Sequence, residues 1–317
     1  LWGFNRIGNV PAEMKKAGLK IAAVQTCISP WENWGGNKYQ YLGELIKYTD
    51  SAMRENPDFI IWSESATLEP VSFRRRTGKE APFDRMLFDH VKKWGKPLFT
   101  GEIGVTGKKE GMFMEVFPQN NAVLINGEGR VVDSYAKIFL VPFGEWFPYE
   151  KIFPAVKRLV ASFGGSSFVP GEKPLLFEVN NLKFGPLICY EGIFYRLCRD
   201  YKIMGADFLV NITNDGWTDT YNGHFQHFSA SVFRAVENGL WVVRAGNTGV
   251  SAVVDPLGRV AGDFPILKKG YFTGSVYPEM NRETFYSRAG DIILYASALY
   301  IIVLFIIISI KGRIKED

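Results

Sequence analysis

Three chain-distant residues could together carry nucleophilic catalysis: Glu64, Lys137 and Cys189. Each stands just after an apolar, strand-like run of the sequence. A thiolate can attack a carbonyl carbon, a carboxylate can first take the thiol proton, and an ammonium can stabilise the oxyanion that forms. Singly, Glu64 and Lys137 would be surface charges and Cys189 a buried structural cysteine, so the hypothesis requires that the three residues meet.

The expected secondary structure offers a way for them to meet. Residues 19–26 and 58–62 are apolar and β-prone, and apolar residues recur at helical spacing over residues 37–56 between them. The pattern continues with helices at 83–94, 193–204 and 223–238 and strands at 97–105, 121–125, 130–135, 174–179, 182–188, 207–213, 240–245, 250–255 and 259–261. This alternation predicts an α/β protein whose helix-covered sheets gather side chains at the strand ends. Cys189 would lie at a strand-to-helix corner, where a helix N-terminus favours the thiolate.

The composition excludes several other classes of protein. A chain of 317 residues with 47% hydrophobic content can bury a large core. A balance of 37 basic against 33 acidic residues gives a net charge of only +4, which does not support nucleic-acid binding. Cys27, Cys189 and Cys198 lack the spacing of a disulfide framework or a zinc site. We therefore expect a free thiol, no metal and no cofactor.

Two of the three histidines, His224 and His227, fall three residues apart in the expected helix 223–238. This spacing puts both on one helical face, which could suggest a metal site or a catalytic base. No third ligand of suitable type lies nearby in the sequence. A hydrogen-bonded structural role is therefore the preferred interpretation.

Residues 292–310 differ from the rest of the chain because they carry no charge. As a helix rising about 1.5 Å per residue, this stretch spans roughly 30 Å, the thickness of a bilayer's hydrocarbon core. Lys311, Arg313 and Lys315 follow it. The positive-inside rule then places the C-terminus in the cytoplasm and the preceding domain on the outer face of the membrane.

Five motifs surround these residues. They are Trp62-Ser-Glu64-Ser-Ala, Tyr135-Ala-Lys137-Ile-Phe-Leu-Val-Pro-Phe-Gly-Glu145, Cys189-Tyr-Glu191, Asn214-Asp-Gly-Trp217 with Gln226-His227, and Arg234-Ala-Val-Glu-Asn238 through Arg244-Ala-Gly-Asn-Thr-Gly249. In this order, over about residues 19–276, they resemble the nitrilase superfamily. Leu-Val-Pro-Phe-Gly-Glu and Cys-Tyr-Glu are most similar to its apolipoprotein N-acyltransferase family.

The resemblance implies a four-layer αββα sandwich with Glu64 as general base, Lys137 as oxyanion stabiliser and Cys189 as nucleophile. It also implies supporting or substrate-binding roles for Glu145, Tyr190, Glu191, Trp34 and Trp217. In the implied reaction, Cys189 takes an acyl chain from a phospholipid as a thioester and passes it to the N-terminal amine of a diacylglyceryl-cysteine apolipoprotein. Such an enzyme works at the bacterial cytoplasmic (inner) membrane, with its catalytic domain on the periplasmic face.

Two motifs depart from the family pattern. Trp62-Ser-Glu64-Ser stands for the usual Trp-Pro-Glu-Thr, which alters the turn before the carboxylate, and Thr218-Asp219 stands for the usual Phe-Gly. The segment after the first strand is also looser than the pattern, so the motifs do not decide which tryptophan there lines the site. They do not indicate acyl-chain preference, phospholipid headgroup or oligomeric state either.

The expected domains are a lead-in at 1–18, a nitrilase-like catalytic domain at 19–280, a transmembrane helix at 291–311 and a cytoplasmic tail at 312–317. The first residue is Leu, no signal peptide is recognisable, and the lead-in could be the end of a missing membrane region. The alternative function is a membrane-anchored carbon-nitrogen hydrolase of amidase or nitrilase type, in which water attacks the thioester. A catalytically silent binding domain with the same fold is a third.

Residues 143–168 are rich in aromatic side chains and contain an amphipathic helical pattern with basic flanks. Such a segment can lie in a membrane interface. Packing against the protein's own core is an equally good interpretation. Our hypothesis is that the segment forms a lipid-facing arm over the active site.

Overall fold

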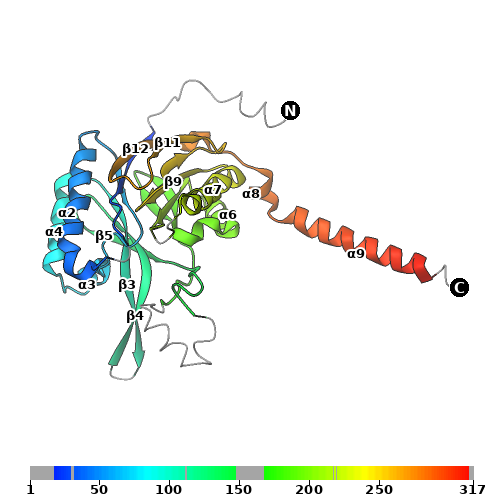
Figure 1. The fold of residues 1–317 in the computed structure, drawn as a ribbon, viewed down its shortest axis with the longest axis horizontal. Helices are drawn as coiled ribbons and strands as arrows, with labels where there is room; N and C mark the ends of the chain where they lie inside the picture. Colours follow the sequence, from blue (N-terminus) through cyan, green and yellow to red (C-terminus); the bar gives the residue numbers. More distant parts are fainter. Residues whose placement is uncertain are drawn as a thin grey trace.

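The computed structural model describes residues 18–29, 32–110, 113–147, 168–216, 218 and 220–313. The lead-in up to residue 17, the greater part of the aromatic segment 143–168, Trp217 and the last residues of the tail lie outside this description. Within it, two six-stranded sheets lie face to face and helices cover both outer faces (Figure 1). The predicted αββα sandwich is therefore confirmed.

The first sheet has the order β12-β1-β2-β3-β4-β5. Its strands are β1 (Leu19–Gln25), β2 (Phe59–Trp62), β3 (Leu98–Glu110), β4 (Phe113–Ile125), β5 (Val131–Ala136) and β12 (Gly270–Val276). The three central strands β1, β2 and β3 run parallel, and the outer strands pair antiparallel. Helices α2 (Trp34–Met53), α3 (Val71–Arg76) and α4 (Pro82–Trp94) lie on this side of the molecule (Figure 1).

The second sheet has the order β11-β10-β9-β8-β7-β6 and repeats this arrangement. Its strands are β6 (Phe177–Val179), β7 (Leu182–Ile188), β8 (Phe208–Thr213), β9 (Trp241–Gly246), β10 (Ser251–Val254) and β11 (Val260–Phe264). Again the central strands β7, β8 and β9 are parallel and the edges antiparallel. Helices α6 (Tyr195–Ile203) and α7 (Tyr221–Asn238) pack on its outer face.

Phenylalanine rings from both sheets form the centre of the core. The ring of Phe184 in β7 lies 5.4 Å from that of Phe59 in β2 and 5.1 Å from that of Phe99 in β3, and all three side chains are fully buried. Burying one such side chain stabilises the fold by about 1.5–3 kcal/mol. Contact between the inner faces therefore fixes the distance at which the strand ends of the two sheets meet.

Several elements differ from those expected. The helix predicted at 193–204 is interrupted: a 3-10 helix, η1 (Cys189–Ile193), comes first, and α6 begins at Tyr195 because Phe194 is extended, with φ −81° and ψ 94°. Strands β3 and β4 pair along 13 residues each, well beyond the predicted strands. Strand β12 and helix α3 were not predicted. The hairpin joining β4 to β5 was predicted and is confirmed.

The chain leaves the sandwich through a short helix, α8 (Phe285–Ala289), and continues in α9 (Ile292–Arg313) (Figure 1). The guanidinium of Arg196 in α6 lies 3.1 Å from the carboxylate of Asp291, between α8 and α9. Over Ile292–Ser309 the mean hydropathy is 2.7 and no residue is buried. Within the described chain, α9 is the one helix whose length and composition would allow it to cross a membrane.

Candidate active site

Glu64 lies just beyond the end of β2, in a turn that is pressed against β3. Ser65 next to it has a positive φ of 53°. A Cβ at Gly101 would come within 2.3 Å of the Ser65 nitrogen and 2.7 Å of the Glu64 Cα, so only glycine permits this approach. The packing of β3 therefore fixes the backbone from which the Glu64 side chain projects.

Four buried side chains form a cluster: Glu64 after β2, Asn120 within β4, and Lys137 and Glu145 after β5. The Lys137 ammonium lies 2.8 Å from a carboxylate oxygen of Glu145 and 3.5 Å from one of Glu64. Asn120 donates from one amide nitrogen to both carboxylates, at 2.8 Å to Glu64 and 2.7 Å to Glu145. The backbone N–H of Asn214, in the second sheet's half of the molecule, donates to the other Glu64 oxygen at 2.8 Å. The Glu64 carboxylate therefore accepts hydrogen bonds from both halves of the sandwich.

Cys189 is the first residue of η1, directly after β7, and its backbone has a positive φ of 50°. The left-handed region is unusual for a residue with a Cβ. The side chain is buried, with 4% of the residue's surface exposed. Both Glu64 and Lys137 interact electrostatically with the thiol. The structure therefore brings Glu64, Lys137 and Cys189 together.

Burial dominates the acid–base properties of this cluster. It raises the pKa of the Glu64 carboxyl, and neighbouring Glu145 adds to the effect while the Lys137 ammonium opposes it. Burial also raises the pKa of the Cys189 thiol, as does the charge of Glu64, while Lys137 acts in the opposite direction. For Lys137 itself, the surrounding anions outweigh burial and raise its pKa, so it remains an ammonium. A carboxylate of raised pKa beside a protonated thiol is suited to accept that thiol's proton.

Glu191 joins the Lys137 segment to the Cys189 segment. One of its oxygens accepts hydrogen bonds from the Ile138 N–H at 2.7 Å and the Tyr135 hydroxyl at 2.7 Å, and the other from the Ile188 N–H at 2.9 Å. The residue is fully buried, and burial raises the pKa of its carboxyl to about 7 against these hydrogen bonds. Glu191 therefore holds the backbone on either side of the cluster in place.

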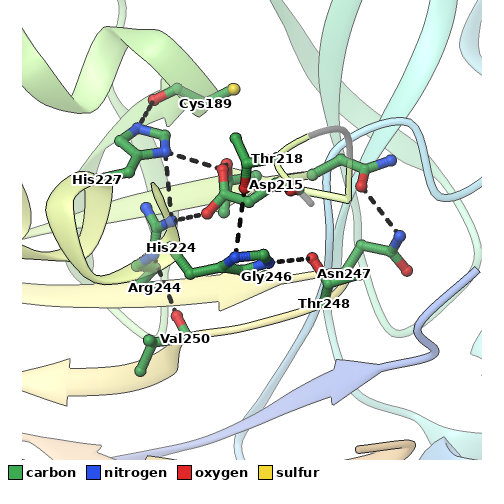
Figure 2. A network of polar contacts seen from close by, with 12 residues as sticks. Cys189, Asp215, Thr218, His224, His227, Arg244, Gly246, Asn247, Thr248 and Val250 are labelled. Carbon is green, nitrogen blue, oxygen red and sulfur yellow. Dashed lines mark hydrogen bonds and ion pairs between the residues drawn. The ribbon is translucent and has the colours of Figure 1, made fainter. Parts of the chain in front are cut away.

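A second polar cluster lies on the other side of Cys189 (Figure 2). Asp215, after β8, pairs with the guanidinium of Arg244 in β9 and lies 2.8 Å from Nδ1 of His227 in α7. The other ring nitrogen of His227, Nε2, lies 3.1 Å from the backbone carbonyl oxygen of Cys189. Burial opposes ionisation of Asp215, but Arg244 and His227 outweigh it and hold its pKa at about 2.

Cys189, Asp215 and His227 also place three atoms of metal-ligand type within 4.8 Å of one another. Protein groups already engage two of these residues. His227 uses both ring nitrogens, and both oxygens of Asp215 have partners, in Thr213 and His227 on one side and Arg244 on the other. A metal would have to displace these contacts, so we interpret the group as a hydrogen-bonded network.

The remaining predicted residues lie at varying distances from the cluster. Glu145 and Glu191 are part of it. Tyr190 follows Cys189, and its ring packs edge-on against Phe194 at 5.1 Å. Trp34 begins α2, where its ring lies 4.9 Å from that of Tyr41. Trp217 lies outside the described residues.

Sequence reasoning assigned no role to Asn120, Asp215 or Arg244, and it preferred a structural role for His227. Three of the four stand in the quoted motifs, so the motifs could have indicated them. Asn120 had no such signal, because its position depends on the unexpected length of β4.

Aromatic residues closely follow Lys137 and Cys189 in the chain. Phe139 stacks on Phe194, with ring centroids 4.2 Å apart, and Phe143 and Trp146 follow along the chain. Phe143 is 71% exposed and Trp146 39%. With Phe147 and Phe168, these two are the described aromatic residues of the segment 143–168 predicted from the sequence.

Comparison with known proteins adds to this geometry. The family profile described as carbon-nitrogen hydrolase matches residues 20–286. An amidase from Nesterenkonia sp. of known structure is similar in fold, with a TM-score of 0.62 and 18% identity over 90% of this chain and 98% of that one. Another structure of that amidase, with a TM-score of 0.61 and 18% identity over 90% and 99% of the two chains, carries the acetamide moiety of fluoroacetamide on its active-site cysteine.

Curated relatives with higher identity are apolipoprotein N-acyltransferases. That of Geobacter metallireducens is 41% identical over 300 residues, which are 93% of this chain and 54% of the relative. That of Rickettsia prowazekii is 30% identical over 311 residues, which are 98% of this chain and 59% of the relative. The chain thus spans somewhat more than half the length of these relatives.

Proposed function

Because the chain belongs to the carbon-nitrogen hydrolase family, we propose that it performs cysteine-dependent acyl transfer, as the catalytic part of an enzyme of the apolipoprotein N-acyltransferase type. One observation favours this over a soluble hydrolase. The family profile ends at residue 286, whereas the similarity to the Rickettsia prowazekii acyltransferase covers 98% of the chain and so includes most of α9. The similarity to this acyltransferase therefore continues past the catalytic sandwich into α9.

In the first half of the proposed reaction, the Cys189 sulfur attacks the ester carbonyl of a phospholipid. Glu64 takes the thiol proton as the C–S bond forms, and the Lys137 ammonium stabilises the oxyanion. The tetrahedral intermediate then collapses, the ester C–O bond breaks, and protonated Glu64 returns its proton to the leaving alkoxide. The products are a lysophospholipid and a thioester on Cys189.

In the second half, the N-terminal amine of a diacylglyceryl-cysteine apolipoprotein attacks the thioester. The C–N bond forms, the C–S bond breaks, and Glu64 takes the proton that the amine loses. Lys137 stabilises the same oxyanion position as before. Proton transfer to the sulfur regenerates the Cys189 thiol, so the cycle needs no cofactor.

Asn120, found in the structure, and the other predicted residues support this cycle. Glu145 and Asn120 hold Lys137 and Glu64 in place, and Glu191 holds the loops that carry Lys137 and Cys189. Tyr190, Trp34 and Trp217 remain proposed substrate contacts. The exposed rings of Phe143 and Trp146 suit an acyl chain or a membrane interface at the entrance.

The proposed localisation rests on the length and apolar composition of α9. We place residues 291–311 across the cytoplasmic membrane of a bacterium, the catalytic domain 19–280 on the periplasmic face, and the basic tail 312–317 in the cytoplasm. Protease protection in sealed inside-out and right-side-out vesicles tests this orientation. Accessibility of the sandwich from the cytoplasmic side would contradict it.

The direct test of function is acyl-enzyme formation. The membrane-reconstituted protein is incubated with a phospholipid carrying a labelled acyl chain, and label that hydroxylamine releases is sought on the protein. We expect such label on the wild type, none on Cys189→Ala, and loss of the wild-type label on adding a synthetic diacylated lipopeptide. Absence of label on the wild type would contradict the proposal.

The second candidate function is a membrane-anchored carbon-nitrogen hydrolase with the same three catalytic residues. Its support is the fold similarity to the Nesterenkonia amidase. Here a small amide would acylate Cys189 and water would release the acid. Hydrolysis of short amides without acylation by phospholipid would favour this function.

A further inference from the structure

The ring nitrogens of His227 have three polar neighbours, one of which is Nη2 of Arg244, 3.4 Å from Nδ1. Nδ1 also lies 2.8 Å from Oδ1 of Asp215, and Nε2 lies 3.1 Å from the carbonyl oxygen of Cys189 (Figure 2). A backbone carbonyl only accepts hydrogen bonds, and so does an ionised carboxylate. The contact with the Cys189 carbonyl therefore requires a hydrogen on Nε2, whereas Nδ1 lies between a carboxylate that accepts and a guanidinium that donates.

An ion pair flanks Nδ1 of the ring. Asp215 is a carboxylate at neutral pH, since its pKa is held at about 2, and it also pairs with the fully buried guanidinium of Arg244. Among the described residues, the charged and titratable neighbours of His227 are the Asp215 carboxylate, the Arg244 guanidinium and Cys189, whose thiol also interacts with Glu64 and Lys137. The ion pair thus orients the ring, and the Cys189 carbonyl accepts the hydrogen bond from Nε2–H.

The hydrogen bond acts on the residue whose backbone is least regular. Cys189 has a positive φ of 50°, and its sulfur points away from the carbonyl that His227 holds (Figure 2). Rotation of this peptide would turn the side chain with it, because φ and ψ set the direction of the Cα–Cβ bond. A fixed carbonyl therefore fixes the direction of the Cα–Cβ bond from which the sulfur projects.

We propose that His227 is a positioning residue for the nucleophile: its Nε2–H, oriented by Asp215 and Arg244, holds the Cys189 carbonyl and so aims the sulfur at the Glu64 and Lys137 side. The proposal rests on the proposed function only in taking Cys189 as the nucleophile. It extends the catalytic machinery to a second cluster, contributed by β8, β9 and α7.

The same helix supplies a matched control. His224 lies one turn before His227 in α7 and is buried, with Nε2 3.1 Å from the Thr248 hydroxyl and Nδ1 3.0 Å from the Thr220 carbonyl. It is a buried, doubly hydrogen-bonded histidine whose described contacts are with loops other than η1. Loss of His224 should therefore lower stability without moving Cys189.

The experiment measures the reactivity of Cys189 without any lipid. Full-length protein is treated with iodoacetamide, and the rate of alkylation at Cys189 is followed by mass spectrometry in the wild type, His227→Gln, His227→Phe and His224→Gln. We expect His227→Phe to slow alkylation about 10- to 100-fold, the size expected for a misplaced nucleophile. His227→Gln keeps an N–H donor and should stay within about threefold of the wild type.

Thermal unfolding of the same variants separates positioning from stability. We expect His224→Gln to lower Tm as much as His227→Gln does while Cys189 keeps its wild-type alkylation rate. Wild-type alkylation in folded His227→Phe would overturn the proposal, as would equal slowing in His224→Gln. A wild type that alkylates normally but forms no acyl-enzyme from phospholipid would refute the proposed function and leave the role of His227 intact.

Nitrogen NMR tests the hydrogen positions independently. The chain has only three histidines, so ¹⁵N-histidine labelling gives a sparse spectrum, and His227→Gln assigns the signal of interest. A hydrogen on Nε2 of His227 is expected in the folded protein. A ring with a bare Nε2 would overturn the proposal even if the variants were slow.

Discussion

The two sides of Cys189 are both lined by charged, buried side chains, yet they differ in what protons can do there. On the side of the first sheet, Glu64 and Glu145 share one ammonium, and burial raises the pKa of Glu64. On the side of the second sheet, Asp215 is paired with a guanidinium and a histidine, and its pKa is about 2. A carboxylate with a raised pKa takes up a proton more readily than one whose pKa is held at about 2. The first side is therefore suited to proton transfer, and the second to keeping Cys189 and its neighbours in position.

The largest effect should come from Lys137→Met, because Lys137 is the one cation in direct contact with both carboxylates of the first cluster. We expect acyl-enzyme formation to fall by about 10³-fold, as when an oxyanion donor is removed. Single-turnover labelling by phospholipid measures this rate. The control is Lys269→Met, which removes an exposed lysine paired with Glu44 and should leave the rate unchanged. Normal labelling of a folded Lys137→Met protein would show that acyl-enzyme formation does not need Lys137.

Glu64→Gln should have the next largest effect, since the amide keeps the size of the side chain but cannot take the thiol proton. We expect a loss of about 10²- to 10³-fold in the rate of acyl-enzyme formation. Because the carboxyl is lost without a large change of shape, Tm should change little. If Asp215→Asn reduced the chemical step more than Glu64→Gln did, the division of roles between the two sides would be wrong.

Glu191 gives a pH dependence of stability. Its carboxyl has a pKa of about 7 in the folded protein against 4.5 as reference, so the folded state holds a proton that the unfolded state has lost. Stability should therefore fall as pH rises from 4.5 to 7, by about 3 kcal/mol from this group. Urea unfolding at several pH values measures the slope. Glu191→Gln should flatten it in this interval, and an unchanged slope would assign it to another group.

Asp215 should give the opposite and smaller dependence. Its pKa is lowered from 3.8 to about 2, so its contribution is complete above pH 3.8 and is lost as pH falls through 2. The size is about 2 kcal/mol. In Asp215→Asn this acid-side loss should disappear, while the slope due to Glu191 remains. Identical acid unfolding of the variant and the wild type would show that ionised Asp215 does not stabilise the folded protein.

The sequence predicted the first side of Cys189 better than the second. Glu64, Lys137 and Cys189 could be found because each follows an apolar strand, and parallel strands end at one edge. The fold class followed from the same alternation. Asp215, His227 and Arg244 stand in the quoted motifs, but their contacts with one another arise only when β8, β9 and α7 pack together.

The missed elements have local reasons of their own. β12 has Gly270 and Gly274 among its residues, which weakens the strand pattern, and it is held by antiparallel pairing with β1 at the other end of the chain. In β4, Pro118 and its polar neighbours weaken the strand pattern of the sequence. Pairing with β3 makes the strand longer than that pattern predicts. The break before α6 arises at Phe194, whose ring stacks on Phe139 in another segment. Each case is a tertiary contact that overrides a local preference.

The close packing of Gly101 against the Glu64 turn has a genetic consequence. A survey of all single substitutions scored by activity would group Gly101 with the catalytic residues, although glycine offers no functional group. Even Gly101→Ala would push on the backbone of Glu64 and Ser65, because the added carbon would lie 2.3 Å from a nitrogen atom. Such a survey would therefore identify Gly101, which packs against the backbone of the proposed catalytic carboxylate, as well as Glu64 itself.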